Sequence, residues 1–118
     1  MRFSLSLILL ILLFSSCKDE IDLSSSACGS SDPINDVSWL AAIVSDMEAN
    51  KSRSMVSLYS YKKEKVFLVS ICYQCPDAIT AAYDCDQNLI CVFGGFAGQN
   101  TCPDFEDEAI FIETLYEK

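Results

Sequence analysis

Hydrophobic and polar residues change their spacing along the chain, and each spacing predicts a different kind of element. Through VSWLAAIVSDMEAN (37–50), apolar residues recur every three to four positions, which predicts an amphipathic helix. We expect Asp36 to be its N-cap and Asn50 to end it. The apolar face of this helix is predicted to consist of Val37, Leu40, Ala41, Val44 and Met47, widened by Trp39 and Ile43.

Four later segments are predicted to be strands. The first alternates with a period of two, and the second, VFLVSIC, is rich enough in β-branched and aromatic residues to be well buried. The third and fourth, AITAAYDC and LICVF, flank the polar turn at residues 86–88. Short connections pair them as two hairpins, and the predicted strands are residues 55–61, 66–72, 78–85 and 89–93.

The last segment, FEDEAIFIETLYEK (105–118), fits both a helix and a strand. We expect a short helical turn followed by an edge strand. The sequence therefore predicts an α+β fold over residues 37–118. One N-terminal amphipathic helix packs on a small antiparallel four- or five-stranded sheet braced by disulfides.

The beginning of the chain has the three-part layout of a secretory signal. Arg2 precedes the apolar run Phe3–Phe14, and Ser15 and Ser16 lead directly to Cys17. The run is too short to remain as a spanning helix, which needs about 20 apolar residues. Small residues before a cysteine resemble the lipobox of bacterial lipoproteins, although Phe14 stands where leucine is usual. The resemblance implies that residues 1–16 are removed and that Cys17 carries acyl chains such as palmitate.

A charged and serine-rich stretch follows Cys17. The triplet Lys18-Asp19-Glu20 resembles a signal that moves some Gram-negative lipoproteins to the outer-membrane surface, and a solvated charge cluster explains it equally well. We expect residues 17–36 to form a flexible tether with an end-to-end distance of about 25 Å. The expected location is the envelope of a Gram-negative bacterium. There the protein would be lipid-anchored at the outer membrane, on its periplasmic or surface face.

The charge of the chain limits its partners. There are 17 acidic and 8 basic residues, and the formal net charge is −9. Clustered cations are needed for phosphate binding, so we expect no nucleic-acid partner. Most of the basic residues lie between Lys51 and Lys65, which is interpreted as a solvated hairpin turn or, less simply, as a surface that steers a partner.

Six cysteines remain besides Cys17, and an even number in an exported chain predicts disulfides. Their pairing stays open. We expect the five in the second half to pair largely among themselves, and Cys28 either to clamp the tether to the domain or to stay unpaired. The candidates are Cys28, Cys72, Cys75, Cys85, Cys91 and Cys102.

Three more specific interpretations of the cysteines and of the loop 84–88 have less support. A zinc site at Cys72–Cys75 and Cys85–Cys91 has the wrong second spacing and no histidine. A calcium site in the loop 84–88 lacks the glycine and the bidentate glutamate of an EF-hand. A thiol redox site at CYQC needs a following helix to lower the pKa of a thiol, and the segment 76–84 is a candidate for it. We expect no metal and no cofactor.

The chain contains no histidine, which removes Ser/His/Asp hydrolysis, Cys/His proteolysis and His-ligated metal catalysis. The loop FGGFAG (93–98) lacks the order of glycines and the lysine of a phosphate cradle. We therefore expect the protein not to be an enzyme.

One resemblance adds to this picture. The run YDCDQNLICVFGGFAGQNTCPDF (83–105), together with Trp39-Leu40 and the pair Tyr59 and Tyr61, resembles a family of small, cysteine-bearing bacterial lipoproteins. The C-terminal domain of that family has no assigned function. The resemblance implies export and a compact α+β domain, and it brings no catalytic residues.

The expected function is that of a membrane-anchored envelope lipoprotein that binds a protein or peptide without catalysis. The candidate binding surface comprises Tyr59, Tyr61, Phe96 and Gln99. Two alternatives remain, namely a thiol oxidoreductase that uses Cys72 and Cys75, and a small protease inhibitor that presents residues 99–103.

Overall fold

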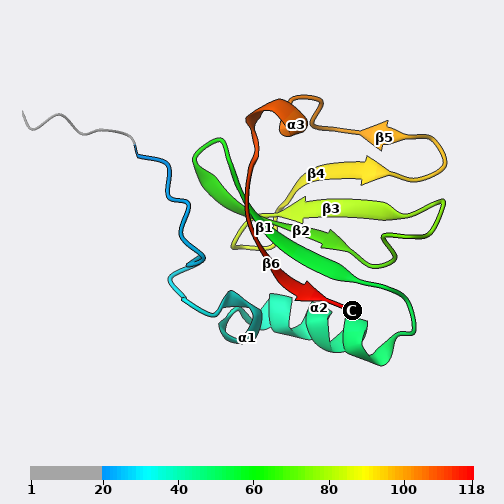
Figure 1. The fold of residues 1–118 in the computed structure, drawn as a ribbon, viewed down its shortest axis with the longest axis horizontal. Coiled ribbons are helices and arrows are strands. Elements are labelled where there is room, and N and C mark those ends of the chain that lie inside the picture. Colours follow the sequence, from blue (N-terminus) through cyan, green and yellow to red (C-terminus); the bar gives the residue numbers. More distant parts are fainter. Residues whose placement is uncertain (1–19) are drawn as a thin grey trace, which may run out of the picture.

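The computed structural model describes residues 20–118, so the expected signal, the expected lipidation site Cys17 and its next two residues lie outside the described part. A short helix, a longer helix and six strands with one further helix follow one another along the chain (Figure 1). Their bounds are α1 (Pro33–Asp36), α2 (Ser38–Ala49), β1 (Met55–Tyr61), β2 (Glu64–Ser70), β3 (Ile79–Tyr83), β4 (Leu89–Gly94), β5 (Gln99–Asn100), α3 (Phe105–Glu108) and β6 (Ile110–Glu117).

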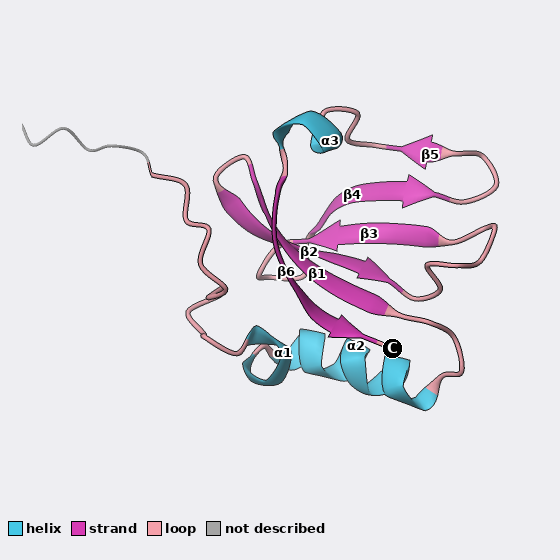
Figure 2. Cartoon of the chain, viewed as in Figure 1, coloured by secondary structure: helices cyan, strands magenta, loops and turns pink. Residues whose placement is uncertain are grey.

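All six strands form one antiparallel sheet in the order β5-β4-β3-β2-β1-β6. The two predicted hairpins are confirmed, and β6 returns from the far edge to pair with β1 (Figure 2). The connection from β5 to β6 must therefore cross one face of the sheet. The α+β class is confirmed, but the expected four or five strands are too few, because the two-residue strand β5 is too short to show a period of two.

The start of the long helix also differs from the prediction. Asp36 does not cap α2, because it is the last residue of α1 and its Oδ2 accepts a hydrogen bond of 2.6 Å from Ser30 Oγ. The cap residue of α2 is Val37, which makes no side-chain capping bond. Asn50 ends the helix as expected, since its N–H donates to the carbonyls of Asp46 and Met47.

One face of the sheet is covered by α2, and we call it the closed face. The helix residues Leu40, Val44 and Met47 are buried against β1 and β2. Trp39 packs edge-on against Phe67, with ring centroids 5.7 Å apart. Along β1 and β2, their strand partners alternate with residues that face the other side of the sheet, as the period of two requires, and the partners are Val56, Leu58, Phe67 and Val69.

The last residue of the chain ties β6 to the end of α2. Lys118 Nζ donates hydrogen bonds to the carbonyls of Glu48 at 2.8 Å and Met47 at 3.4 Å, and to that of Asn50. A cation at a helix C-terminus satisfies carbonyls that have no partner within the helix. The C-terminus accordingly lies beside the end of α2 (Figure 2).

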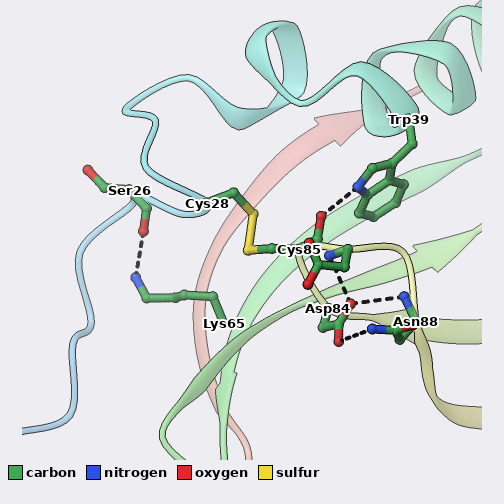
Figure 3. The surroundings of a disulfide bond; sticks show 8 residues. Ser26, Cys28, Trp39, Lys65, Asp84, Cys85 and Asn88 are labelled. Atoms are coloured by element: carbon green, nitrogen blue, oxygen red, sulfur yellow. Dashed lines mark hydrogen bonds between the residues drawn. A yellow bond between two sulfur atoms is a disulfide. The ribbon is translucent and has the colours of Figure 1, made fainter.

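The segment before α1 is fixed to the domain at two points. Cys28 forms a disulfide with Cys85, and Lys65 Nζ donates to the carbonyls of Ser24 and Ser26 (Figure 3). Lys65 also lies 3.6 Å from a carboxylate oxygen of Asp22. The expected clamp at Cys28 is confirmed. The second half of the predicted tether is thus held against the domain and is no free coil.

Candidate binding groove on the open face of the sheet

The face opposite α2, which we call the open face, is covered by the described residues 20–118 only at one end, where the segment that joins β5 to β6 lies. The centre of this cover is Phe105 at the start of α3. The centroid of its ring lies 5.0 Å from the ring centroid of Tyr61, 5.1 Å from that of Phe93 and 5.4 Å from that of Tyr59. The buried residues beneath the cover are Tyr61, Val66, Ala82, Cys91, Cys102 and Phe105.

Polar contacts hold the cover beside Phe105. Tyr61 Oη donates a hydrogen bond of 2.7 Å to Asp104 Oδ1, and Lys62 Nζ lies 3.4 Å from Asp104 Oδ2. The hydrogen bond from Tyr61 holds the pKa of Asp104 below its usual value, and Lys62 lowers this pKa further. The same hydrogen bond raises the pKa of Tyr61.

A disulfide fixes the other end of the cover to the sheet. Cys102 is bonded to Cys91 of β4. Next to this bond, Thr101 N–H donates to the carbonyl of Val92 at 3.1 Å, and Val92 N–H donates to Thr101 Oγ1 at 2.8 Å. The segment is therefore anchored by covalent and backbone contacts as well as by packing.

A groove of about 430 Å³ lies between this cover and the uncovered part of the open face. Strands β2, β3, β4 and β5 each contribute one residue to it, and the cover contributes the rest. The lining is mainly apolar with a few polar groups, which is the composition of ligand sites. The lining residues are Leu68, Thr80, Phe93, Asn100, Cys102, Pro103, Phe105 and Glu106.

The part of the chain that forms the groove coincides with a known family. Residues 42–118 match the family described as a domain of unknown function, DUF6970. The chain belongs to this family. The matched region begins within α2 and contains all six strands, so the groove lies wholly inside the DUF6970 domain, whereas Cys28 and the segment around it precede it.

No curated protein and no solved structure matches the chain. Within residues 20–118, no helix is both long and apolar enough to cross a membrane.

The residues predicted as a binding surface are only partly exposed in the DUF6970 domain. Phe96, at 91% exposure, and Gln99 lie on the surface, but neither lines the groove. Tyr61 was expected to be exposed and is 4% exposed, because its ring packs on Phe105 and its hydroxyl reaches Asp104. Tyr59 is half-buried beside the same ring.

Sequence reasoning found part of the groove and missed the rest. Asn100, Cys102 and Pro103 lie in the loop 99–103 that the protease-inhibitor alternative presents. Leu68 and Thr80 were missed, because they come from separate strands and belong to no motif. The sequence predicted an edge strand after Cys102-Pro103 but not which edge it occupies. The connection over the sheet follows only from the pairing of β6 with β1.

The remaining cysteines of the DUF6970 domain form bonds instead of a metal site. Besides Cys91–Cys102 and the clamp Cys28–Cys85, Cys72 is bonded to Cys75. Because all six form disulfides, none is free to ligate zinc. The segment after Cys75 was a candidate for a helix, and it forms a turn and strand β3, so no helix N-terminus is present to lower the pKa of a thiol there.

The loop between β3 and β4 is a turn stabilised by its own side chains, as expected. Asp84 Oδ1 accepts hydrogen bonds from the N–H groups of Asp86 and Asn88, and Oδ2 accepts one from Asn88 Nδ2, each at 2.9 Å. The hydrogen bond from the Asn88 side chain contributes most to lowering the pKa of Asp84. Among the residues that the structure describes, no group of three or more His, Cys, Asp or Glu side chains could hold a metal ion.

Proposed function

We propose that this chain is a non-enzymatic envelope lipoprotein whose DUF6970 domain binds a protein or peptide on the open face. The observation that carries the proposal is the groove beside Phe105, whose walls are fixed before any partner arrives. Cys91–Cys102 and the Tyr61–Asp104 hydrogen bond hold the cover in place. A preformed site binds without the cost of ordering its own loops.

The shape of the aromatic surface favours a polypeptide over a small molecule. Four rings form a row from β4 to the edge strand β6, and their successive centroids are 5.1, 5.4 and 5.5 Å apart. The row is Phe93, Phe105, Tyr59 and Phe111, and the last of these is 55% exposed. An elongated row of rings offers contacts to several consecutive residues of an extended segment, and aromatic anchors dominate the energetics of protein interfaces.

The proposed anchor is acylated Cys17, and the fixed segment shortens the tether that follows it. Asp22 is the first residue with a contact to Lys65, so only residues 18–21 separate that contact from Cys17. At about 3.3–3.6 Å per residue, this part of the chain reaches at most about 18 Å. The domain would therefore sit nearer the bilayer than a free tether of residues 17–36 allows.

Intact-mass measurement and non-reducing peptide mapping of protein purified from membranes test the anchor. We expect an acylated N-terminal Cys17 and the three bridges Cys28–Cys85, Cys72–Cys75 and Cys91–Cys102. A product that retains residues 1–16 and carries no acyl chain would contradict this part of the proposal.

The binding proposal is tested by blocking the groove at an exposed residue. Pro103 lines the groove and is exposed, so Pro103→Arg adds bulk there without disturbing the core. Pro76→Arg makes the same change in the exposed loop before β3, and serves as the matched control. In cross-linking from intact cells, we expect a partner that is captured by the wild type and by Pro76→Arg but lost with Pro103→Arg. Equal capture by both variants would remove the groove from the proposal.

A thiol oxidoreductase is the second candidate, and the bond between Cys72 and Cys75 is the observation that favours it. Both cysteines are partly exposed, so a partner thiol could reach them. Alkylation at pH 6 after mild reduction distinguishes the two functions. A thiolate that reacts at that pH supports redox chemistry, and two unreactive thiols reject it.

A further inference from the structure

The groove is bordered by acidic residues that the domain itself only partly neutralises. Asp104, Glu106, Asp107 and Glu108 lie within five consecutive positions on the cover, and the last three are exposed. One ion pair at this end of the sheet joins Lys62 to Asp104. From Asp84 to the end of the chain there are eight acidic residues and one basic residue, Lys118, whose amine is engaged at the end of α2.

The domain contains its own example of how this surface holds a cation. The ammonium group of Lys62 lies 5.1 Å from the centre of the Tyr61 ring and 3.4 Å from a carboxylate oxygen of Asp104. An aromatic face and a carboxylate both attract a cation, and the two contributions act together. Phe93, Phe105 and Glu106 line the groove, and their side chains are of the same two kinds.

We propose that the groove binds a basic side chain, arginine in preference to lysine, carried by an extended segment of a partner polypeptide. This inference rests on the proposed function and adds the chemistry of the partner. A guanidinium group is planar, so it can stack on an aromatic ring while it donates two hydrogen bonds to one carboxylate. Leu68 and Pro103 offer apolar contacts to the methylene groups of the same side chain.

The charge around the groove selects against other partners. An acidic or phosphorylated segment would bring a like charge to Glu106 and its neighbours, which costs binding free energy. A neutral segment would leave the Glu106 carboxylate desolvated without a partner. The aromatic row that continues through Tyr59 to Phe111 then receives the neighbouring residues of the same segment.

The test uses the intact, oxidised protein, isotope-labelled and extracted from membranes in detergent micelles. The probes are acetylated seven-residue peptides of one sequence, with leucines around a central position that holds arginine, lysine, glutamate or citrulline. Citrulline has the shape of arginine without its charge. Amide chemical shifts report which residues each peptide contacts, and titration at low and high salt reports its affinity.

We expect the arginine peptide to shift the amides of Phe93 and Phe105 most, and to bind about tenfold more tightly than the citrulline peptide. Glu106→Gln should reduce this preference to less than about twofold. Glu48→Gln removes the same charge from an exposed residue of α2, on the opposite side of the sheet, and should leave the preference intact.

Several results would overturn the inference. Equal binding of the arginine and citrulline peptides at the groove would remove the charged recognition and leave the proposed function standing. Equal loss in Glu48→Gln and Glu106→Gln would assign the effect to net charge alone. If no peptide shifts a groove residue and partner capture is also insensitive to Pro103→Arg, the proposed function itself fails with the inference.

Discussion

On the closed face of the sheet, the twelve-residue helix α2 places an unbroken apolar stripe on β1 and β2. On the open face, a crossing segment with a four-residue helix covers only one end of the sheet. The first cover consists mainly of aliphatic and aromatic packing, with hydrogen bonds from Trp39 Nε1 to the carbonyl of Cys85 and from Lys118 to the end of α2. The second adds a disulfide, a tyrosine–carboxylate hydrogen bond and an ion pair to a single buried phenylalanine.

The difference follows from the length of the covering segment. An amphipathic helix of three turns offers enough apolar area to hold itself in place, whereas the short crossing segment does not. Covalent and polar contacts therefore hold the short segment. Because it leaves part of the sheet uncovered, the groove forms on that side. The closed face supplies stability, and the open face carries the groove that we propose as a binding surface.

The largest effect should come from the closed face. Phe67 is 0% exposed and packs beneath α2 against Trp39, so Phe67→Ala should lower the free energy of unfolding by about 3–5 kcal/mol. That loss is a large fraction of the stability of a small domain. Phe111→Ala, at a half-exposed ring of the open face, should cost less than about 1 kcal/mol. Urea unfolding measures both, and similar losses would contradict the contrast between the faces.

The three disulfides should contribute different amounts to the free energy of unfolding. Constraint of the unfolded chain grows with the loop that a bridge closes, and the three separations are 57, 11 and 3 residues. We expect the double serine variants of Cys28/Cys85, Cys91/Cys102 and Cys72/Cys75 to lose about 4, 3 and 2 kcal/mol respectively.

Only one of these variants should also affect the groove. The Cys91/Cys102 variant frees the cover of the open face, so it should weaken peptide binding while the protein is still folded. The Cys28/Cys85 variant, although less stable, should bind normally in the folded state. Binding at low temperature separates the two, and equal binding by both would show that the bridge does not shape the groove.

The contrast between the faces also explains what the sequence could predict. Leu40, Val44 and Met47 lie on one stripe because a single sheet covers them, so the helical period was visible. Strands β1 to β4 likewise show their period or their β-branched content, and the final turn and edge strand followed from the mixed pattern of residues 105–118.

The open face could not be predicted in the same way. Tyr61 is buried because its hydroxyl meets Asp104, 43 residues away, and no local pattern records such a contact. The groove combines Leu68, Thr80 and Pro103 from three distant segments. A two-residue strand such as β5 carries no period at all. Each of these features depends on contacts between residues far apart in the sequence, and the local spacing of apolar residues does not indicate such contacts.

The turn between β1 and β2 contacts the open-face cover through Lys62, and its backbone at Lys63 provides a smaller test of stability. Lys62 and Lys63 both have positive φ, of 50° and 65°, in a two-residue hairpin turn that favours glycine at its second position. Lys63→Gly should therefore have a free energy of unfolding about 0.5–1 kcal/mol higher than that of Lys63→Ala. Both variants lose the lysine side chain, and only glycine relieves the left-handed backbone at this position. Thermal unfolding compares them, and peptide binding should be unchanged in both.

The smallest effect concerns pH and is specific to the open face, since the closed-face cluster contains no carboxylate or lysine. The folded state holds the pKa of Asp104 below its usual value of 3.8, mainly through the hydrogen bond from Tyr61. The stability from this group is therefore present above that value and is lost as the pH falls through the lower, folded-state pKa. The urea midpoints of wild type and Asp104→Asn should therefore differ at pH 6. They should converge below about pH 4, as the Asp104 carboxylate of the wild type becomes protonated. Asp107→Asn removes an equal charge next to this site but keeps the Tyr61–Asp104 bond. The difference between its urea midpoint and that of the wild type should therefore not vanish in acid in this way. A difference for Asp104→Asn that persists unchanged in acid would mean that the ionised form of the carboxylate does not stabilise the cover.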